Sequence, residues 1–257
     1  MEKEFASKTL LVTGATSGIG RAAAFRFAAA GANIAAVGRN ETALTELKRE
    51  LSDLGAECLT IQADLSNPES AADVVSQTEN HLGGIDVLVN AAGHISNGTV
   101  ETTSLDAWDA MLDINLRAVF VLIQKAVPSL IKRRGNIVNV SSVTGLRAFP
   151  GVLAYCVSKA GLDQLTRCAS LELAGKGVRV NAVNPGVVVT EIHKRGGMSG
   201  PDYEAFLARS KETHPLGRVG EAREIAELIL FLASDRASWI TGVTYSIDGG
   251  RAQTCAR

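Results

Sequence analysis

Short runs of apolar and β-branched residues alternate with longer helical segments along the whole chain. The runs occupy residues 9–13, 33–38, 57–64, 85–93, 135–142, 178–186 and 243–250. Most are apolar at consecutive positions, which is typical of parallel strands that are buried on both faces. Strands of this kind, separated by helices, predict an α/β fold. We therefore expect a doubly wound, Rossmann-type parallel sheet of about seven strands with helices on both faces.

Helical patterns fill most of the intervals between these strands. They cover residues 17–31, 41–55, 67–82, 104–133, 153–174 and 221–233. No repeat, low-complexity linker or change of composition marks a domain boundary, so residues 1–257 are expected to form a single domain. The irregular stretch 187–220 is longer than an ordinary connection, and such segments usually carry function. We expect it to bind substrate and to contain a short helix around residues 203–211.

The composition is that of an ordinary globular protein, with 46% hydrophobic and 21% charged residues. A net charge of −1 gives no reason to expect a nucleic acid or a membrane surface as partner. The charged N-terminal segment does not resemble a secretory signal, and no apolar stretch approaches the roughly 18 residues of a membrane span, so we expect a cytoplasmic protein. The cysteines and histidines lack disulfide or metal-ligand spacing, and Cys156 is interpreted as a small buried thiol.

The sequence TGATSGIG joins the first strand to the first helix, at residues 13–20. Its spacing, Gly14-x3-Gly18-x-Gly20, differs from the more familiar GxGxxG. Glycines permit positive φ angles and a close approach of the backbone to a ligand, while the N–H groups at a helix N-terminus attract a pyrophosphate. The motif therefore indicates a dinucleotide-binding turn, although a plain tight turn would also use glycines.

The second strand ends in VGRN. Gly38 and Arg39 stand where an NAD-binding sheet usually has an acidic residue for the ribose 2′-hydroxyl. A guanidinium suits the 2′-phosphate of NADP(H) instead. We therefore favour NADP(H) as cofactor, with NAD(H) possible. The alternative interpretation of Arg39 is a solvated loop charge.

Several short motifs follow one another in an order that resembles the short-chain dehydrogenase/reductase family. They are TGATSGIG, Asp64 after the third strand, NAAG (90–93), Asn115, Ser142, YCVSK (155–159), NPG (184–186) with Thr190, and DGG (248–250). The resemblance runs from about Lys8 to Gly250, and the spacing from Ser142 to Tyr155 to Lys159 is customary in that family. Ala91 departs from the asparagine that the family often has there. In general style the chain resembles the 3-oxoacyl-carrier-protein reductases.

The resemblance implies an oxidoreductase that transfers a hydride between NADP(H) and a carbonyl compound or secondary alcohol. It makes Tyr155 the general acid and base, and Lys159 the group that lowers the pKa of Tyr155 and holds the nicotinamide ribose. It makes Ser142 the donor to the substrate oxygen and Asn115 the holder of a relay water. Asp64 is expected to meet the adenine, and residues 185–190 to close over the carboxamide. The expected cofactor-binding residues are Gly14, Thr16, Ser17, Gly18, Ile19, Gly20, Arg39, Asn40, Asp64, Leu65, Asn90, Ala91, Gly93, Tyr155, Lys159, Pro185, Gly186, Val188 and Thr190.

A physical argument supports the roles of Tyr155 and Lys159. At positions i and i+4 they share one face of a helix, and Ser142 ends a strand at the edge where open α/β sheets bind ligands. An ammonium about 5 Å from the phenol, at an effective dielectric constant of about 20, contributes roughly 3 kcal/mol, or about two pKa units. We therefore expect a pKa of about 8 for Tyr155.

Substrate selectivity is expected to lie in residues 187–220 and in the segments after Gly93 and Ser142. Their apolar side chains favour a moderately apolar carbonyl compound, and they are Leu146, Phe149, Leu153, Ile192 and Met198. His94 could touch the substrate, but it is interpreted as a surface or structural residue. Arg147 and Arg195 could meet an acidic substrate, but they are interpreted as solvated loop charges. Carrier-protein reductases commonly have an arginine where this chain has Leu171, and the cations of IKRRG (131–135) suit a helix C-terminus. A carrier-protein substrate is therefore not favoured.

Two alternatives remain open. One is an NAD-dependent alcohol or hydroxysteroid dehydrogenase. The other is a catalytically idle cofactor-binding or interaction protein, which the intact set of four catalytic residues disfavours. The family resemblance also implies a homotetramer built through the helices at 104–133 and 153–174 and the C-terminal strand. Val119, Phe120 and Leu165 are compatible with such an interface or with a core face.

Overall fold

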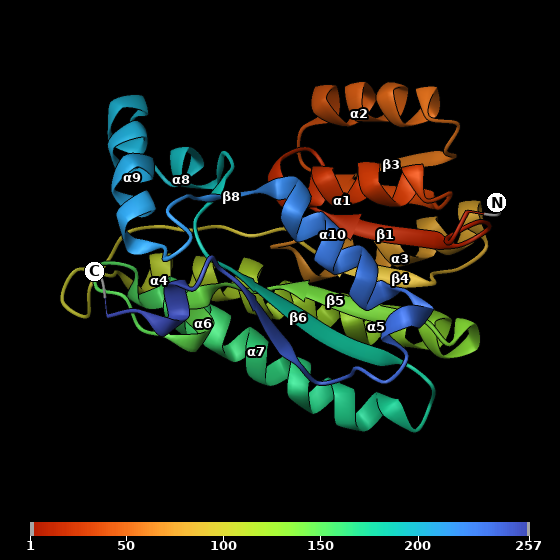
Figure 1. Ribbon diagram of the computed structural model, residues 1–257. Helices are drawn as coiled ribbons and strands as arrows, with labels where there is room; N and C mark the ends of the chain where they lie inside the picture. Colours follow the sequence, from red (N-terminus) through yellow and green to blue (C-terminus); the bar gives the residue numbers. More distant parts are fainter. Residues whose placement is uncertain (1–2, 256–257) are drawn as a thin grey trace.

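Seven parallel strands form one sheet, as predicted, and their order is β3-β2-β1-β4-β5-β6-β9 (Figure 1). The computed structural model describes residues 3–255. The strands are β1 (Thr9–Thr13), β2 (Asn33–Gly38), β3 (Cys58–Gln62), β4 (Val87–Asn90), β5 (Asn136–Val140), β6 (Arg179–Pro185) and β9 (Thr244–Ile247). The chain winds outward from β1 in one direction and then restarts at β4 in the other, so the carboxyl ends of β1 and β4 flank a switch point.

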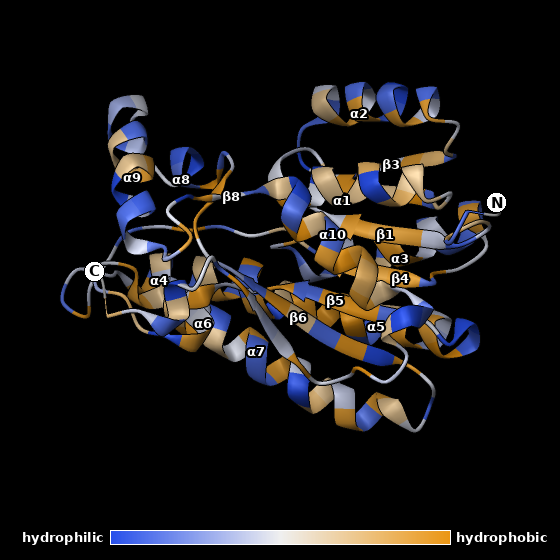
Figure 2. Ribbon diagram, viewed as in Figure 1, coloured by the Kyte–Doolittle hydropathy of each residue, from blue (hydrophilic) through white to orange (hydrophobic). Residues whose placement is uncertain are grey.

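Helices cover both faces of the sheet because successive residues of each strand point to opposite sides. Leu10 and Val12 of β1 face one core, and Leu11 between them faces the other. The first core is closed by α1 (Gly18–Ala29), α2 (Glu41–Asp53) and α10 (Ala222–Ala233). The second is closed by α3 (Pro68–Leu82), α5 (Ala118–Arg133) and α7 (Leu153–Ala174). Figure 2 shows the apolar residues concentrated on the strands, with polar residues on the outer side of α2.

The segment predicted as one helix at 104–133 is interrupted near its middle. It consists of α4 (Leu105–Leu112), a π-helical turn η1 (Asp113–Arg117) and α5. By length and composition alone, Leu105–Arg133 is apolar enough to cross a membrane, so the expectation that no such stretch exists is wrong. We interpret it as a core helix, because its inner face packs into the second core through Ala118, Leu122 and Ala126.

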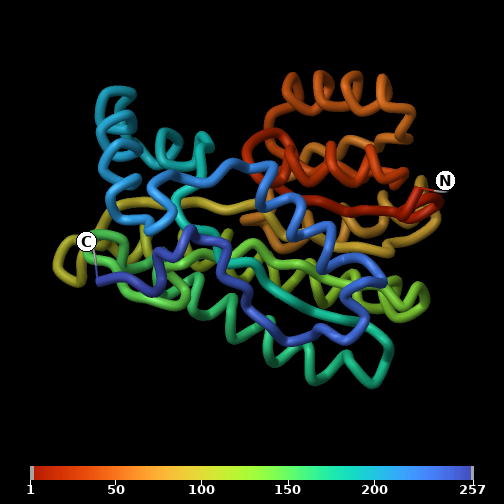
Figure 3. The backbone as a smooth tube through the Cα atoms, viewed as in Figure 1, coloured from red at the N-terminus to blue at the C-terminus, as the bar shows by residue number. Residues whose placement is uncertain are grey.

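Residues 187–220 form a small unit above the carboxyl edge of the sheet. It contains α8 (Ile192–Arg195), α9 (Gly200–Thr213) and the strand β7 (Val188–Val189), which pairs with β8 (Gly220–Glu221). The helix expected around 203–211 is α9. Short helices α6 (Val143–Leu146), η2 (Asp235–Ala237) and η3 (Arg251–Gln253) complete the fold. Figure 3 shows the two ends of the chain at opposite sides of the domain, with the C-terminal end on the side of α8 and α9.

Candidate active site

A cavity of about 690 Å³ opens at the carboxyl edge of the sheet, beside the switch point between β1 and β4. Open α/β sheets bind their ligands at this place. Most of the residues predicted for the site line this one cavity. They are Gly14, Thr16, Ser17, Gly18, Ile19, Arg39, Asp64, Leu65, Ala91, Gly93, Ser142, Tyr155, Lys159, Pro185, Gly186, Val188 and Thr190.

The glycine-rich turn approaches the opposite wall of the cavity closely. Gly14 has a φ of +65°, and a Cβ there would lie 2.9 Å from the carbonyl oxygen of Ala91. Gly18 has a φ of +54°, and a Cβ there would lie 3.0 Å from the Thr190 methyl group. Thr13 fixes this arrangement, because its hydroxyl accepts hydrogen bonds from the backbone N–H groups of both Ala91 and Ala92, each at 3.0 Å. Sequence reasoning missed this role of Thr13.

Three residues predicted to bind the cofactor do not line the cavity. Gly20 packs against the Gly14 carbonyl and leaves no room for a Cβ there. The Asn40 side chain caps α2 by accepting a hydrogen bond from Ala43 N–H at 3.0 Å. Asn90 is buried and donates to Asn139 Oδ1 at 2.9 Å, behind the cavity wall. Local packing or capping already engages all three, and their direct contact with a cofactor stays a prediction.

Asn115 lies behind the cavity wall and not in it. It is fully buried at the centre of η1. Its Oδ1 accepts from His94 N–H at 2.9 Å, and its Nδ2 lies within hydrogen-bonding distance of the His94 carbonyl and of Ser158 Oγ. A Cβ on Gly93 would lie 3.3 Å from Asn115 Oδ1 and 3.8 Å from Lys159 Nζ, so only Gly93 separates the two side chains. Asn115 therefore positions the Gly93–His94 segment beside Lys159.

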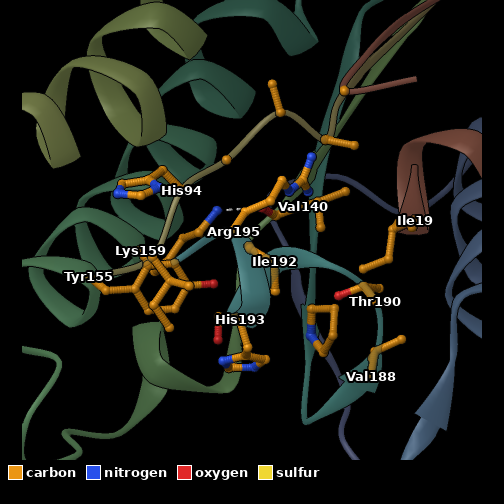
Figure 4. Close-up of a pocket in the computed structure, with 18 of the residues that line it drawn as sticks. Ile19, His94, Val140, Tyr155, Lys159, Val188, Thr190, Ile192, His193 and Arg195 are labelled. Atoms are coloured by element: carbon orange, nitrogen blue, oxygen red, sulfur yellow. Dashed lines mark hydrogen bonds between the residues drawn. The ribbon is translucent and has the colours of Figure 1, made fainter. Parts of the chain in front are cut away.

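Tyr155 and Lys159 come from the first turns of α7 and reach the cavity together (Figure 4). Lys159 is only 4% exposed, and its Nζ donates to the Val140 carbonyl at 2.8 Å. It lies 5.7 Å from the centre of the Tyr155 ring. Ser142 lies two residues after β5, at the N-cap of α6, and forms a hydrogen bond with Tyr155, while its own Oγ accepts from Thr144 N–H at 3.2 Å. The hydroxyl groups of Ser142 and Tyr155 thus meet on one wall.

The structure corrects the expected acidity of Tyr155. Burial raises the pKa of Tyr155 to about 12, with the Ser142 hydrogen bond opposing this rise and Cys156 adding to it. Burial also lowers the pKa of Lys159 to about 8, against the opposing charge of Asp163. The predicted value near 8 for the phenol is therefore wrong, because the Coulomb argument omitted the cost of burying a phenolate. At neutral pH Tyr155 is a neutral proton donor.

A buried polar network behind Ser142 was not predicted. Asn184 Nδ2 donates to the Ser142 carbonyl at 2.9 Å and to Asp163 Oδ2 at 2.8 Å. Asp163 lies one helical turn after Lys159, and burial raises its pKa. His214 holds the other rim, since its Nε2 accepts from Val187 N–H at 3.1 Å. In the sequence Asn184 and Asp163 are each a polar residue within an apolar pattern. A single sequence does not show whether such a residue is buried or solvated.

The cavity fits a nicotinamide dinucleotide. The turn at Gly14 and Gly18 leaves backbone exposed to a pyrophosphate. Arg39 stands at the end of β2 on the cavity wall, and no hydrogen bond or ion pair within residues 3–255 engages its guanidinium. Asp64 is held by Ser66, whose backbone and side-chain hydrogen bonds lower its pKa. Lys159 has three N–H donors, of which the Val140 carbonyl takes one.

The expected substrate residues separate into two groups. Phe149 and Ile192 line the cavity, together with His94, whose pKa is lowered by burial and then by Arg39 and Arg195. His94 therefore lies where it could touch a substrate, which is the alternative that the sequence left open. Arg147 is structural, because its guanidinium donates to the carbonyls of Ala252 and Thr254 in the C-terminal segment. Leu146, Leu153 and Met198 do not line the cavity formed by the described residues.

Comparisons with known proteins agree with this geometry. A family model described as enoyl-(acyl carrier protein) reductase matches residues 14–252. A 3-oxoacyl-[acyl-carrier-protein] reductase FabG from Thermotoga maritima is 39% identical, and the match covers 95% of this chain and 97% of the length of that reductase. A 2,5-dichloro-2,5-cyclohexadiene-1,4-diol dehydrogenase LinX from Sphingobium indicum is 36% identical over 97% of this chain and 98% of its own. A short-chain dehydrogenase/reductase of unknown function from Caenorhabditis elegans, solved with cofactor, superposes with a TM-score of 0.91 at 36% identity, covering 98% of this chain and 97% of its own.

Proposed function

The chain belongs to the short-chain dehydrogenase/reductase family of oxidoreductases, and from this premise we propose that it is an NADP(H)-dependent carbonyl reductase. The observation that carries the proposal is the meeting of Ser142, Tyr155 and Lys159 on one wall of a cavity beside the dinucleotide turn. Members of the family bind nicotinamide cofactors. The preference for NADP(H) is supported by Arg39, because a guanidinium at the end of β2 suits a ribose 2′-phosphate.

Tyr155, Ser142 and Lys159 have separate roles in the proposed reaction. The bound cofactor supplies the hydride when a carbonyl compound is reduced. Tyr155 gives its proton to the carbonyl oxygen, so that one hydride and one proton convert the carbonyl compound to an alcohol. Ser142 donates a hydrogen bond to the same oxygen and stabilises its growing negative charge. The Lys159 ammonium holds ribose hydroxyls and stabilises the phenolate that remains. In alcohol oxidation each step is reversed.

The high pKa of Tyr155 favours reduction at neutral pH. A phenol with a pKa of about 12 is fully protonated there and ready to donate. Oxidation needs the phenolate instead, which burial makes costly. We therefore infer that reduction is the faster direction near neutral pH and that oxidation gains at alkaline pH.

A second candidate is reduction of a 3-oxoacyl group on a carrier protein, which the name of the Thermotoga maritima relative favours. Carrier-protein reductases commonly have an arginine where this chain has Leu171, which is 84% exposed on α7. The lack of that cation supports a small-molecule substrate. Comparing a 3-oxoacyl carrier protein with the matching small thioester separates the two candidates.

The two alternatives that the sequence left open predict different cofactor use and turnover. An NAD-dependent alcohol dehydrogenase, in line with the name of the Sphingobium indicum relative, would use NADH and NADPH about equally or prefer NADH. An idle cofactor-binding protein would bind NADPH without turnover. Initial rates with both cofactors, over a panel of ketones and alcohols, distinguish these cases.

The test of the catalytic assignment is Tyr155→Phe. Loss of the general acid should lower kcat by about 10²- to 10⁴-fold. NADPH binding, followed by quenching of Trp108 and Trp239 fluorescence, should be unchanged because the ring is retained. A variant that keeps more than a tenth of the wild-type kcat would disprove the role of Tyr155.

We also propose a cytoplasmic homotetramer. Phe120 on α5 and Val157 on α7 are exposed apolar residues, whereas Val119 is buried in the second core and Leu165 packs against it. Trp239 is 99% exposed, and Tyr245 of the edge strand β9 is 40% exposed. Surfaces of this kind favour burial against a second copy. Sedimentation analysis tests the tetramer, and a stable monomer at micromolar concentration would exclude it.

A further inference from the structure

The walls of the active-site cavity carry an excess of positive charge. Among the described residues that line it, the cationic side chains are Arg39, Lys159, Arg195, Arg209 and Arg251. The only carboxylate among those residues is Asp64, which follows β3 at the end distant from α8. A concave site with one sign of charge concentrates ligands of the opposite sign. The dinucleotide phosphates account for part of this charge, and Arg39 serves them in the proposed function.

Arg195, Arg209 and Arg251 are the lining cations to which the proposed function gives no role. Arg195 ends α8 and lines a smaller cavity of about 350 Å³ together with Arg39, Gly93, His94 and Ile192. No hydrogen bond or ion pair within residues 3–255 engages its guanidinium. Partial burial lowers the pKa of Arg195, Arg39 lowers it further, and Glu191 opposes both effects. Two guanidinium groups that share a cavity without a carboxylate in its wall leave a place for an anion.

The backbone fixes the position of Arg195 against the segment that carries Ile95. The next residue, Gly196, packs so tightly that a Cβ there would lie 2.5 Å from the Ile95 carbonyl oxygen. Ile95 in turn packs against the small cluster of Met111, Ala154 and Tyr155. Figure 4 draws Arg195 near the middle of the view, beside Val140 and between the labels of His94 and Ile192. Arg195 is therefore held beside the Gly93–His94 segment, in a cavity that it shares with Arg39.

We propose that Arg195 binds a carboxylate of the substrate, so that the enzyme acts on oxo acids or hydroxy acids with an apolar body; this deepens the proposed function and rests on it. A single guanidinium matches the two oxygens of a carboxylate. The apolar part of the substrate meets Ile95, Phe149 and Phe206, which line the same cavity.

The test measures binding, so that it does not depend on turnover. Unreactive straight-chain acids from butanoate to decanoate and the matching amides are titrated into the NADP⁺-saturated protein by calorimetry. The best acid should bind the wild type roughly 10- to 100-fold more tightly than its amide. Arg195→Gln should reduce this ratio to below about threefold, and Arg195→Lys should restore part of it. The matched control is Lys194→Gln, one residue away on α8 and outside the cavity lining, which should leave the ratio unchanged.

Three outcomes overturn the proposal. In the first, no acid binds more tightly than its amide. In the second, Arg195→Gln leaves the ratio intact. In the third, Arg195→Gln weakens NADP⁺ and leaves the ratio intact, which would assign Arg195 to a cofactor phosphate. The proposed function fails separately, if no oxo acid, oxo ester or neutral ketone shows turnover that depends on Tyr155.

Discussion

Replacing Lys159 by methionine should stabilise the protein while it abolishes turnover. Lys159 is buried, and its pKa is lowered from 10.5 to about 8. The unfolded chain therefore holds the proton more tightly than the folded one, and this difference costs about 3 kcal/mol of stability at pH 7. Methionine fills a similar volume without the charge. Losing the hydrogen bond to the Val140 carbonyl costs about 1 kcal/mol, so the net gain is about 2 kcal/mol.

The pH dependence identifies the cause of this gain. Between the folded pKa of about 8 and the unfolded value of 10.5, stability of the wild type rises with pH, because the folded protein has already released the proton. The charge penalty falls to about 2 kcal/mol at pH 9 and below about 1 kcal/mol at pH 10. The advantage of Lys159→Met should therefore shrink as the pH rises and vanish near pH 10.

Thermal unfolding without cofactor, at a fixed protein concentration, measures the effect. The melting temperature should rise by about 4–8 °C at pH 7 and change little at pH 10. Lys48→Met, at an exposed position on α2, is the matched control and should show no pH-dependent gain. A Lys159→Met protein less stable than the wild type at pH 7, or with the same gain at pH 7 and pH 10, would refute the assignment of a buried charge penalty.

Three further predictions address the cofactor turn and the proton chemistry. Gly14→Ala should destabilise the protein by about 2 kcal/mol or more and weaken NADPH binding, since a Cβ there meets backbone at 2.9 Å; Gly55→Ala, with a φ of +77° and open space, is the melting-temperature control. Arg39→Gln should raise the KM for NADPH by roughly 10- to 100-fold and leave that for NADH within about threefold, and equal effects on both would contradict a phosphate contact. Asp163→Asn should move the limb of the pH–activity profile that follows the ionisation of Lys159 to lower pH, because the Asp163 charge raises the pKa of that lysine. An unshifted profile would show that the two groups do not interact.

The fold was predictable because its strongest signals are local. Short apolar and β-branched runs marked the seven strands of the main sheet, and a helix pattern placed α7 with its observed ends. Predicted strands ran too long at their carboxyl ends, as at 57–64 and 85–93, because Asp64 and Gly93 follow the strand and turn toward the cavity. The paired strands β7 and β8 were not predicted, since two residues carry no periodicity.

Motif order predicted that Tyr155 and Lys159 lie together, and both line one cavity, but it did not predict the energetics there. The direction of the Tyr155 pKa shift depends on how completely the surrounding segments bury the phenol, and no short stretch of sequence contains that information. The same holds for Asn184 and Arg195, whose partners and surroundings are set by chain segments distant in sequence.

The π-helical turn at Asp113–Arg117 affects how the helical segment Leu105–Arg133 tolerates the deletion of a residue. A π turn holds one residue more than an α turn, so it inserts Asn115 without rotating the apolar stripe of α5 away from the sheet. Elsewhere in α5, deleting one residue would swing every later side chain by about 100° around the axis. Excising Asn115 alone should instead leave a straight, regular helix and an intact core, with the His94 backbone deprived of its amide partner. The protein can thus lose this catalytic support in a single step without losing its fold.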